Sequence, residues 1–137
     1  VRWNTNHLEQ MMASIISELN VDESRLNLTG LSMGGSGTWS WAAHQPQRFA
    51  AIAPICGFGN PVTAEKLLDQ PIWAFHGGDD KVVPPSGSQN IVDAIKLLGG
   101  TKVKLTVYEG VDHNSWTETY ANPKLYEWFL DQKREAK

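Results

Sequence analysis

The strongest constraint on the fold of this chain is a repeated alternation of strand-like and helix-like segments. Residues 49–56 and 71–76 form continuous apolar runs, which are typical of strands buried on both faces of a sheet. Residues 102–109 alternate apolar with polar side chains, which places that strand near an edge. Helix-period stretches lie at 34–44 and 86–98. This order predicts a parallel α/β sheet with helices on both faces.

The first part of the chain adds a helix at 7–19 and a short strand at 26–31. Apolar side chains recur along this helix at spacings of three and four residues, so they share one face. Asn6 followed by Glu9 resembles a capping box, which predicts that the helix begins near residue 7. With the segments above, the sheet should have about four strands.

A single domain over residues 1–137 is expected, because this length is close to the commonest domain size. The last helix should break at Asn122-Pro123, where proline suits the first turn of a second piece and asparagine its cap.

Charge and hydropathy argue against several classes of function. The chain carries 15 acidic and 12 basic side chains without a basic cluster, which argues against a nucleic-acid partner. Its longest apolar run, at 49–56, contains Pro54 and is too short to cross a membrane. The single cysteine excludes an internal disulfide framework. None of these features indicates a compartment.

Residues 30–34 match the pattern Gly-x-Ser-x-Gly between a predicted strand and a predicted helix. A tight strand-to-helix turn lifts the serine oxygen clear of the backbone, and glycines on both sides avoid clashes. Ser32 is therefore a candidate nucleophile. Ser36 lacks the second glycine, so we expect it to be a helix-surface hydroxyl.

A nucleophilic serine needs a base that accepts its proton and a carboxylate that orients the base. Asp80 follows the strand-like segment that ends at His76, and His113 follows the segment that ends at Glu109. In α/β folds the site opens at the carboxyl ends of the strands, so these side chains should meet there. The order Ser32, Asp80, His113 is the order that this kind of fold requires.

Three segments resemble the α/β-hydrolase superfamily: Gly-Leu-Ser-Met-Gly-Gly at 30–35, His-Gly-Gly-Asp-Asp-Lys-Val-Val-Pro at 76–84 and Gly-Val-Asp-His-Asn-Ser-Trp at 110–116. More narrowly, they resemble its serine carboxylesterase group, related to phospholipase/carboxylesterase, feruloyl-esterase and polyhydroxybutyrate-depolymerase-like domains. The similarity runs over nearly the whole chain.

This resemblance implies roles for named residues. Ser32 would be the nucleophile, His113 the general base and Asp80 the carboxylate that orients the base. In the family motif the acid stands four residues after the histidine of the His-Gly pair, which selects Asp80 and leaves Asp79 as the alternative. The backbone N–H of Met33 would be one donor of the oxyanion hole.

The chain departs from the superfamily at its beginning. The family fold has further strands before the nucleophile strand, whereas this chain begins at Val1, one helix ahead of it. The resemblance therefore implies a truncated α/β-hydrolase fold, its C-terminal portion, without the loop that supplies a second oxyanion-hole donor. The outer edge of strand 26–31 would be bare, and a bare apolar edge recruits another chain. We expect a homo-oligomer formed through this edge.

Other candidate residues also have structural explanations. Cys56 ends a strand and Trp116 follows His113, so both are expected near the substrate pocket, with core packing as the alternative. His76 is interpreted as packing beside the acid loop. No set of His, Cys or carboxylate side chains has metal-ligand spacing on a shared face, so neither a metal nor a cofactor is expected.

The sequence thus favours a serine esterase that hydrolyses small-molecule, short-chain carboxylic esters through an acyl-enzyme, since no lid or long insertion is visible to bind a lipid tail. Two alternatives stay open. A serine peptidase of the same superfamily would share the Gly-x-Ser-x-Gly-Gly pattern, and a catalytically weak fragment could serve as an interaction module.

Overall fold

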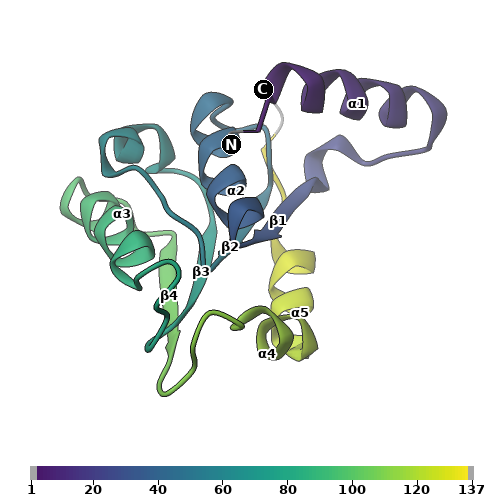
Figure 1. Cartoon of the computed structure of the whole chain (residues 1–137). Coiled ribbons are helices and arrows are strands. Elements are labelled where there is room, and N and C mark those ends of the chain that lie inside the picture. Colours follow the sequence, from purple (N-terminus) through teal and green to yellow (C-terminus); the bar gives the residue numbers. More distant parts are fainter. Residues whose placement is uncertain (1–2, 136–137) are drawn as a thin grey trace.

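The computed structural model describes residues 3–135, so Val1 lies outside the described residues. One sheet of four parallel strands runs through the molecule in the order β1-β2-β3-β4 (Figure 1). The strands are β1 (Asn27–Leu31), β2 (Ala51–Ile55), β3 (Ile72–Gly77) and β4 (Val103–Tyr108). This confirms the predicted parallel sheet, and β4 is an edge strand, as its alternating pattern indicates.

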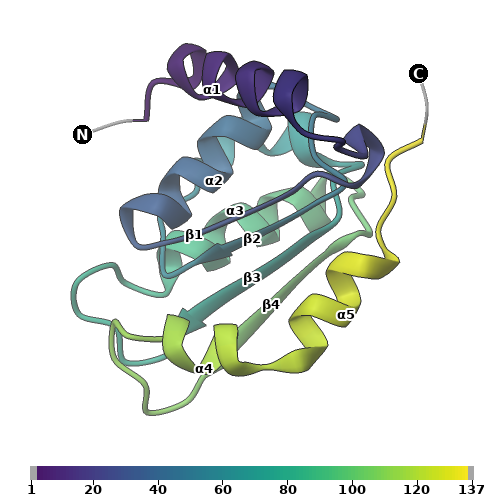
Figure 2. The same cartoon turned by 90° about the vertical axis from the view of Figure 1, so that its right-hand side faces the viewer.

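Helices cover both faces of the sheet (Figures 1 and 2). One face is covered by α2 (Met33–His44), α3 (Ser86–Leu97) and the 3₁₀ segment η2 (Pro61–Leu67). The other face is covered by α4 (Trp116–Ala121) and α5 (Pro123–Asp131). The remaining elements are α1 (Thr5–Glu18), beside α2, and the short 3₁₀ turn η1 (Glu23–Arg25).

The core explains why the central strands read as unbroken apolar runs. All five residues of β2 are buried, because β2 has neighbours on both edges and helices over both faces. Trp39 of α2, Ile91 of α3 and Ile52 of β2 belong to the cluster on one face, while Phe75 of β3 and Leu125 of α5 belong to the cluster on the other. The two clusters therefore fix the helices on both faces of the sheet.

The start of α1 differs from the sequence-based expectation. The helix begins at Thr5, and its cap is Asn4, whose side chain accepts hydrogen bonds from the N–H groups of Asn6 and His7. The capping box expected at Asn6 is wrong, because the carboxylate of Glu9 instead accepts the indole N–H of Trp41 at 2.7 Å. A tertiary contact has taken the place of the local one.

The break near the C-terminus is confirmed. Pro123 is in the first turn of α5, and the side chain of Asn122 accepts a hydrogen bond from the N–H of Lys124 at 3.0 Å. Within residues 3–135, none of the helices has the length and apolar character that a bilayer-crossing helix requires.

Candidate active site

Ser32 alone makes the turn from β1 into α2. β1 ends at Leu31 and α2 begins at Met33, and the backbone of Ser32 has φ 54° and ψ −114°. A residue with a Cβ rarely adopts such a positive φ, so the surrounding structure must hold it there. Part of this support is the Ser32 N–H, which donates to the carbonyl oxygen of Ile55 at 2.9 Å.

Glycines let the strand and the helix approach each other at this turn. A Cβ at Gly30 would collide with the carbonyl oxygen of Gly34, and one at Gly35 would collide with the carbonyl oxygen of Ile55. Both obstacles are backbone atoms, which cannot move aside as a flexible side chain could. Packing thus requires glycine at Gly30, the first glycine of the Gly-x-Ser-x-Gly pattern, and at Gly35, directly after the pattern.

The carboxyl ends of the strands bring the three predicted side chains together. His113, in the loop after β4, places its Nε2 2.9 Å from the Oγ of Ser32. Its Nδ1 lies 2.8 Å from Oδ2 of Asp80, in the loop after β3. Ser32, His113 and Asp80 therefore form one continuous chain of hydrogen bonds. Asp79, the alternative acid, is exposed, and the carboxylate that contacts His113 belongs to Asp80.

The environment of Asp80 keeps its carboxylate charged. Its Oδ1 accepts hydrogen bonds from the N–H groups of Val82 and Val83, both at 2.9 Å, and its side chain is fully buried. Burial alone would raise the pKa of Asp80. The hydrogen bonds from His113, Val83 and Val82 outweigh that effect, so its pKa lies below the ordinary value of 3.8.

The partners of His113 indicate which ring nitrogen carries the proton. An ionised carboxylate only accepts hydrogen bonds, so Nδ1 must donate to Asp80. In the neutral ring Nε2 is then the acceptor, and it accepts a hydrogen bond from the hydroxyl of Ser32. This is the tautomer that a base for Ser32 requires. The ring of Trp116 stands edge-on to His113, with 5.6 Å between the centroids.

Asp112 is a member of the site that the sequence analysis did not single out. Its Oδ1 accepts the backbone N–H of His113 at 2.8 Å and that of Lys81 at 3.2 Å. Asp112 therefore ties the loop that carries His113 to the loop that carries Asp80. The only signal in the sequence is its position directly before His113.

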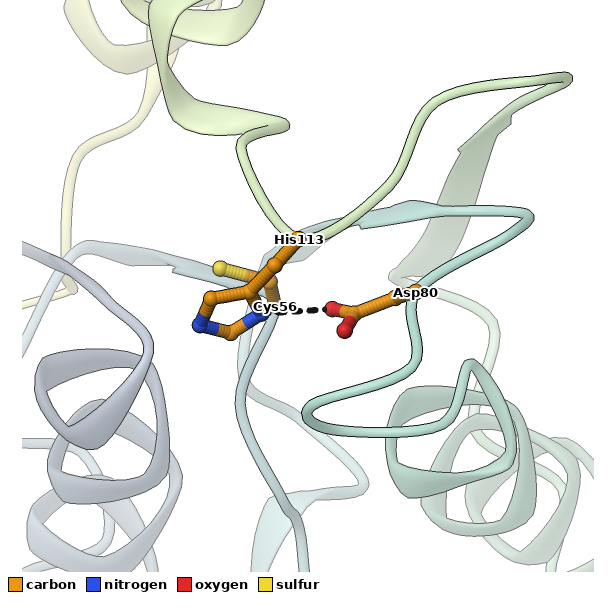
Figure 3. Close-up of side chains that lie close together, drawn as sticks. All are labelled: Cys56, Asp80 and His113. Atoms are coloured by element: carbon orange, nitrogen blue, oxygen red, sulfur yellow. Dashed lines mark hydrogen bonds and ion pairs between the residues drawn. The ribbon is translucent and has the colours of Figure 1, made fainter.

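Cys56 follows β2 and lies against the same two residues (Figure 3). Its sulfur, a carboxylate oxygen of Asp80 and a ring nitrogen of His113 are all within 4.8 Å of one another. Zn²⁺ accepts such donors, but two ligands of one tetrahedral ion lie roughly 3.3 Å apart. The bonded Asp80 and His113 atoms are closer than that, at 2.8 Å, so we interpret the arrangement as a hydrogen-bonded pair with a thiol beside it.

The thiol itself is fully buried, and it offers no exposed surface to a substrate, contrary to its expected place in the pocket. Burial raises the pKa of Cys56 above its ordinary value of 9.0, and the charge of Asp80 also raises it. The nearby polar groups of Ser32 and Ser115 act in the opposite direction without reversing the shift.

A groove of about 470 Å³ opens beside the nucleophile turn, between α2 and η2. Met33 and Phe58 line its near end and are 53% and 57% exposed. Ser36 is part of this wall, and its hydroxyl accepts the N–H of Phe58 at 2.8 Å. Neither Cys56 nor Trp116 lines the groove.

Comparison with known proteins gives a match to the dienelactone hydrolase family over residues 4–129, which includes Ser32, Asp80 and His113. The chain belongs to the dienelactone hydrolase family. Membership confirms the α/β-hydrolase resemblance seen in the sequence, and the sheet of parallel strands agrees with it.

Members and structural neighbours are mostly described as hydrolases. A protein of Escherichia coli K12 named "Putative carboxymethylenebutenolidase" is 31% identical over 111 residues, which are 74% of this chain and 41% of that protein. The crystal structure of a thermostable esterase is 42% identical, with a TM-score of 0.88, and the match covers 93% of this chain and 36% of that one. The chain thus spans less than half the length of either relative.

The acylaminoacyl peptidase of Pyrococcus horikoshii shares the fold alone with this family member. Its TM-score is 0.79 and its identity 17%, with 96% of this chain and 28% of the peptidase covered.

Proposed function

We propose that this chain carries the active site of a serine esterase that hydrolyses carboxylic esters. Ser32 would be the nucleophile, His113 the general base and Asp80 the carboxylate that holds the base. The observation that carries the proposal is the unbroken series of hydrogen bonds from Ser32 Oγ through both ring nitrogens of His113 to buried Asp80. Membership in the dienelactone hydrolase family supports it.

The reaction would proceed in two halves. Ser32 Oγ attacks the ester carbonyl carbon while its proton passes to Nε2 of His113, and Asp80 stabilises the resulting imidazolium. When the tetrahedral intermediate collapses, the bond to the alcohol oxygen breaks and His113 protonates the leaving alkoxide. Water then attacks the acyl-enzyme with His113 again as base, which releases the acid and restores the Ser32 hydroxyl.

The beginning of α2 supports a site for the developing oxyanion. N–H groups in the first turn of a helix have no partner within the helix, and the helix dipole favours negative charge there. Met33 is the first residue of α2 and follows Ser32 directly, so its N–H is the donor we propose. Removing one such donor commonly costs about 10²–10³ in rate.

The groove beside Met33 and Phe58 suits a short acyl chain. Both side chains are apolar and more than half exposed, so they offer contact area next to the nucleophile. We place the acyl group there and the alcohol on the side of Trp116, whose ring edge meets His113.

Hydrolysis of p-nitrophenyl acetate by the chain and by Ser32→Ala tests this function. Ser14→Ala is a matched control, because it removes an exposed serine hydroxyl of α1 that does not line the groove. We expect activity in the chain and in Ser14→Ala and its loss in Ser32→Ala. Equal rates for the chain and Ser32→Ala would contradict the proposal, and cleavage of peptide anilides would favour the peptidase alternative.

We also propose that the outer edge of β1 pairs with a second copy of the chain. β1 is the outermost strand of the described sheet. α1 lies on the β1 side of the molecule (Figure 1). It exposes Met11 and Ile15, and its C-cap residue Leu19 is also exposed. An open strand edge and exposed apolar side chains both promote association.

Light scattering tests this assembly, with Asn27→Pro as the variant. The Leu26 carbonyl and the Ser32 N–H both bond to β2 or its flanks, so by alternation the Asn27 N–H points outward. Proline is tolerated at the first residue of an edge strand, and Leu26 has φ −70° and ψ 121°, which suits a residue before proline. We expect a dimer that Asn27→Pro weakens; a monodisperse monomer would contradict the proposal.

A further inference from the structure

A second histidine lies on the far side of Asp80 and is not used by the mechanism above. His76, in β3, is completely buried. Its Nε2 lies 2.8 Å from the carbonyl oxygen of Val83 and 3.3 Å from Oδ2 of Asp80. Its Nδ1 lies 2.7 Å from the hydroxyl oxygen of Ser88, in the first turns of α3.

The partners of His76 assign its proton. A carbonyl oxygen only accepts hydrogen bonds, so Nε2 must carry the hydrogen that Val83 receives. In the neutral ring Nδ1 is then an acceptor, and the Ser88 hydroxyl donates to it. The ring is thereby held from both sides, and its N–H also faces the charged oxygen of Asp80 at the longer distance of 3.3 Å.

Val83 links this ring to the acid a second time. Its carbonyl accepts from His76, while its N–H donates to Oδ1 of Asp80 at 2.9 Å. His76 therefore fixes the turn 80–83 in the shape that aims backbone N–H groups at Oδ1 and leaves Oδ2 directed at His113. A purely apolar side chain of similar size would fill the space, but it would neither aim these N–H groups at Oδ1 nor keep Oδ2 directed at His113.

We propose that His76 is a positioning residue for Asp80, anchored by Ser88 on α3 and acting on the Asp80–His113 hydrogen bond. This inference rests on the proposed function. The sequence predicts that His76 packs beside the acid loop, and the contacts assign it a further role. In metal sites, loss of a hydrogen-bond partner that orients a ligand typically lowers metal affinity or activity 10- to 100-fold. The same physical reasoning applies to a partner that orients Asp80.

The effect is read at the Asp80–His113 hydrogen bond, which weakens when Asp80 is no longer held in place. The titratable side chains that face this pair among the described residues are Cys56 from the end of β2, His76 from β3 and Asp112 from the loop after β4. All except His76 stay unchanged in the variants below.

Three variants test the proposal. His76→Leu removes both ring nitrogens, His76→Gln keeps a side-chain N–H donor near the position of Nε2, and Ser88→Ala removes only the anchor. Each is measured for kcat and KM on p-nitrophenyl acetate across pH, per active site titrated with a fluorophosphonate. The His113 ring signals and its Nδ1–H resonance are followed by NMR, which needs no turnover.

For His76→Leu we expect kcat to fall about 10-fold, equivalent to roughly 1.4 kcal/mol, with KM changed less than about two-fold. The Nδ1–H resonance of His113 should move upfield, as expected of a weaker hydrogen bond to Asp80. His76→Gln should recover most of the lost kcat, and the kcat of Ser88→Ala should lie between those of His76→Leu and His76→Gln.

An unchanged Nδ1–H resonance of His113 in folded His76→Leu would overturn the proposal, as would equal kcat values for His76→Leu and His76→Gln. If His76→Leu does not fold, Ser88→Ala and His76→Gln are compared with the unchanged chain by the same readouts. A Ser88→Ala variant with unchanged kcat and an unchanged His113 Nδ1–H resonance would then overturn the proposal. An inactive parent chain would contradict the esterase function, whereas the NMR comparison would still test the role of His76.

Discussion

Nδ1 of His113 and Oδ2 of Asp80 lie 2.8 Å apart, although 33 positions separate these residues in the chain. Each belongs to a loop that follows a different strand, and Asp112 ties the two loops together. This pair sets the tautomer of His113 and therefore the direction in which a proton can leave Ser32.

Asp80→Asn tests that pair. An amide carries no charge and cannot hold the imidazolium, so we expect kcat on p-nitrophenyl acetate to fall about 10⁴-fold, the loss typical of an Asp-to-Asn change in such a triad. Asp79→Asn is the matched control, because Asp79 is exposed on the same loop. Comparable losses in both variants would contradict the assignment of Asp80.

The lowered pKa of Asp80 predicts how stability depends on pH. A carboxyl whose pKa is lower in the folded than in the unfolded state stabilises the fold above its unfolded value, here about 3.8, and this contribution is lost as pH falls through the folded value. Urea unfolding of the chain and of Asp80→Asn should therefore differ at about pH 5, and the difference should shrink below about pH 4. A difference that grows as the pH falls below about pH 4 would contradict the ionised state of Asp80.

Gly35→Ala should destabilise the fold, because its Cβ would meet the backbone carbonyl of Ile55 and push α2 from the sheet. Overpacking of this kind typically costs about 1–3 kcal/mol. Gly34→Ala is the control within the same turn of helix, since the added Cβ would have only ordinary contact with the Trp3 side chain at 3.4 Å. Chemical unfolding should rank Gly35→Ala well below Gly34→Ala, and the reverse order would contradict this packing.

Cys56 should be inert in the folded protein. Its thiol is fully buried and its pKa is raised by burial, so little thiolate is present or accessible near pH 7. Reaction with a chromogenic disulfide reagent should be slow in buffer and complete within minutes in guanidinium chloride. Fast reaction in buffer at the same pH would show that the region around His113 opens.

Much of the fold follows from local pattern. The apolar runs predict β2 and β3 because these strands are buried on both faces, and the Asn122-Pro123 break is a local signal that packing does not override. The N-cap of α1 is not predicted by local pattern, since the Glu9 carboxylate accepts a hydrogen bond from the indole N–H of Trp41 in another helix. That contact depends on how α1 lies against α2, and helix periodicity does not contain this information.

The candidate site also has residues that the sequence pattern predicts and residues whose role depends on tertiary packing. Chain order and strand ends predict Ser32, Asp80 and His113, because parallel strands deliver their loops to one edge. The support from His76, Ser88 and Asp112 was not predicted, since it depends on loop conformations and on the depth at which α3 packs. The burial of Cys56 likewise depends on the loops folded over it.

The most direct measurement of the central claim is intact-mass and peptide mapping after treatment with a fluorophosphonate. Only a serine activated by a neighbouring base reacts readily with such a reagent. We predict one adduct per chain on the peptide that contains Ser32, absent in Ser32→Ala and strongly slowed in His113→Ala. An adduct on another residue, or equal labelling of the chain and of His113→Ala, would contradict the account.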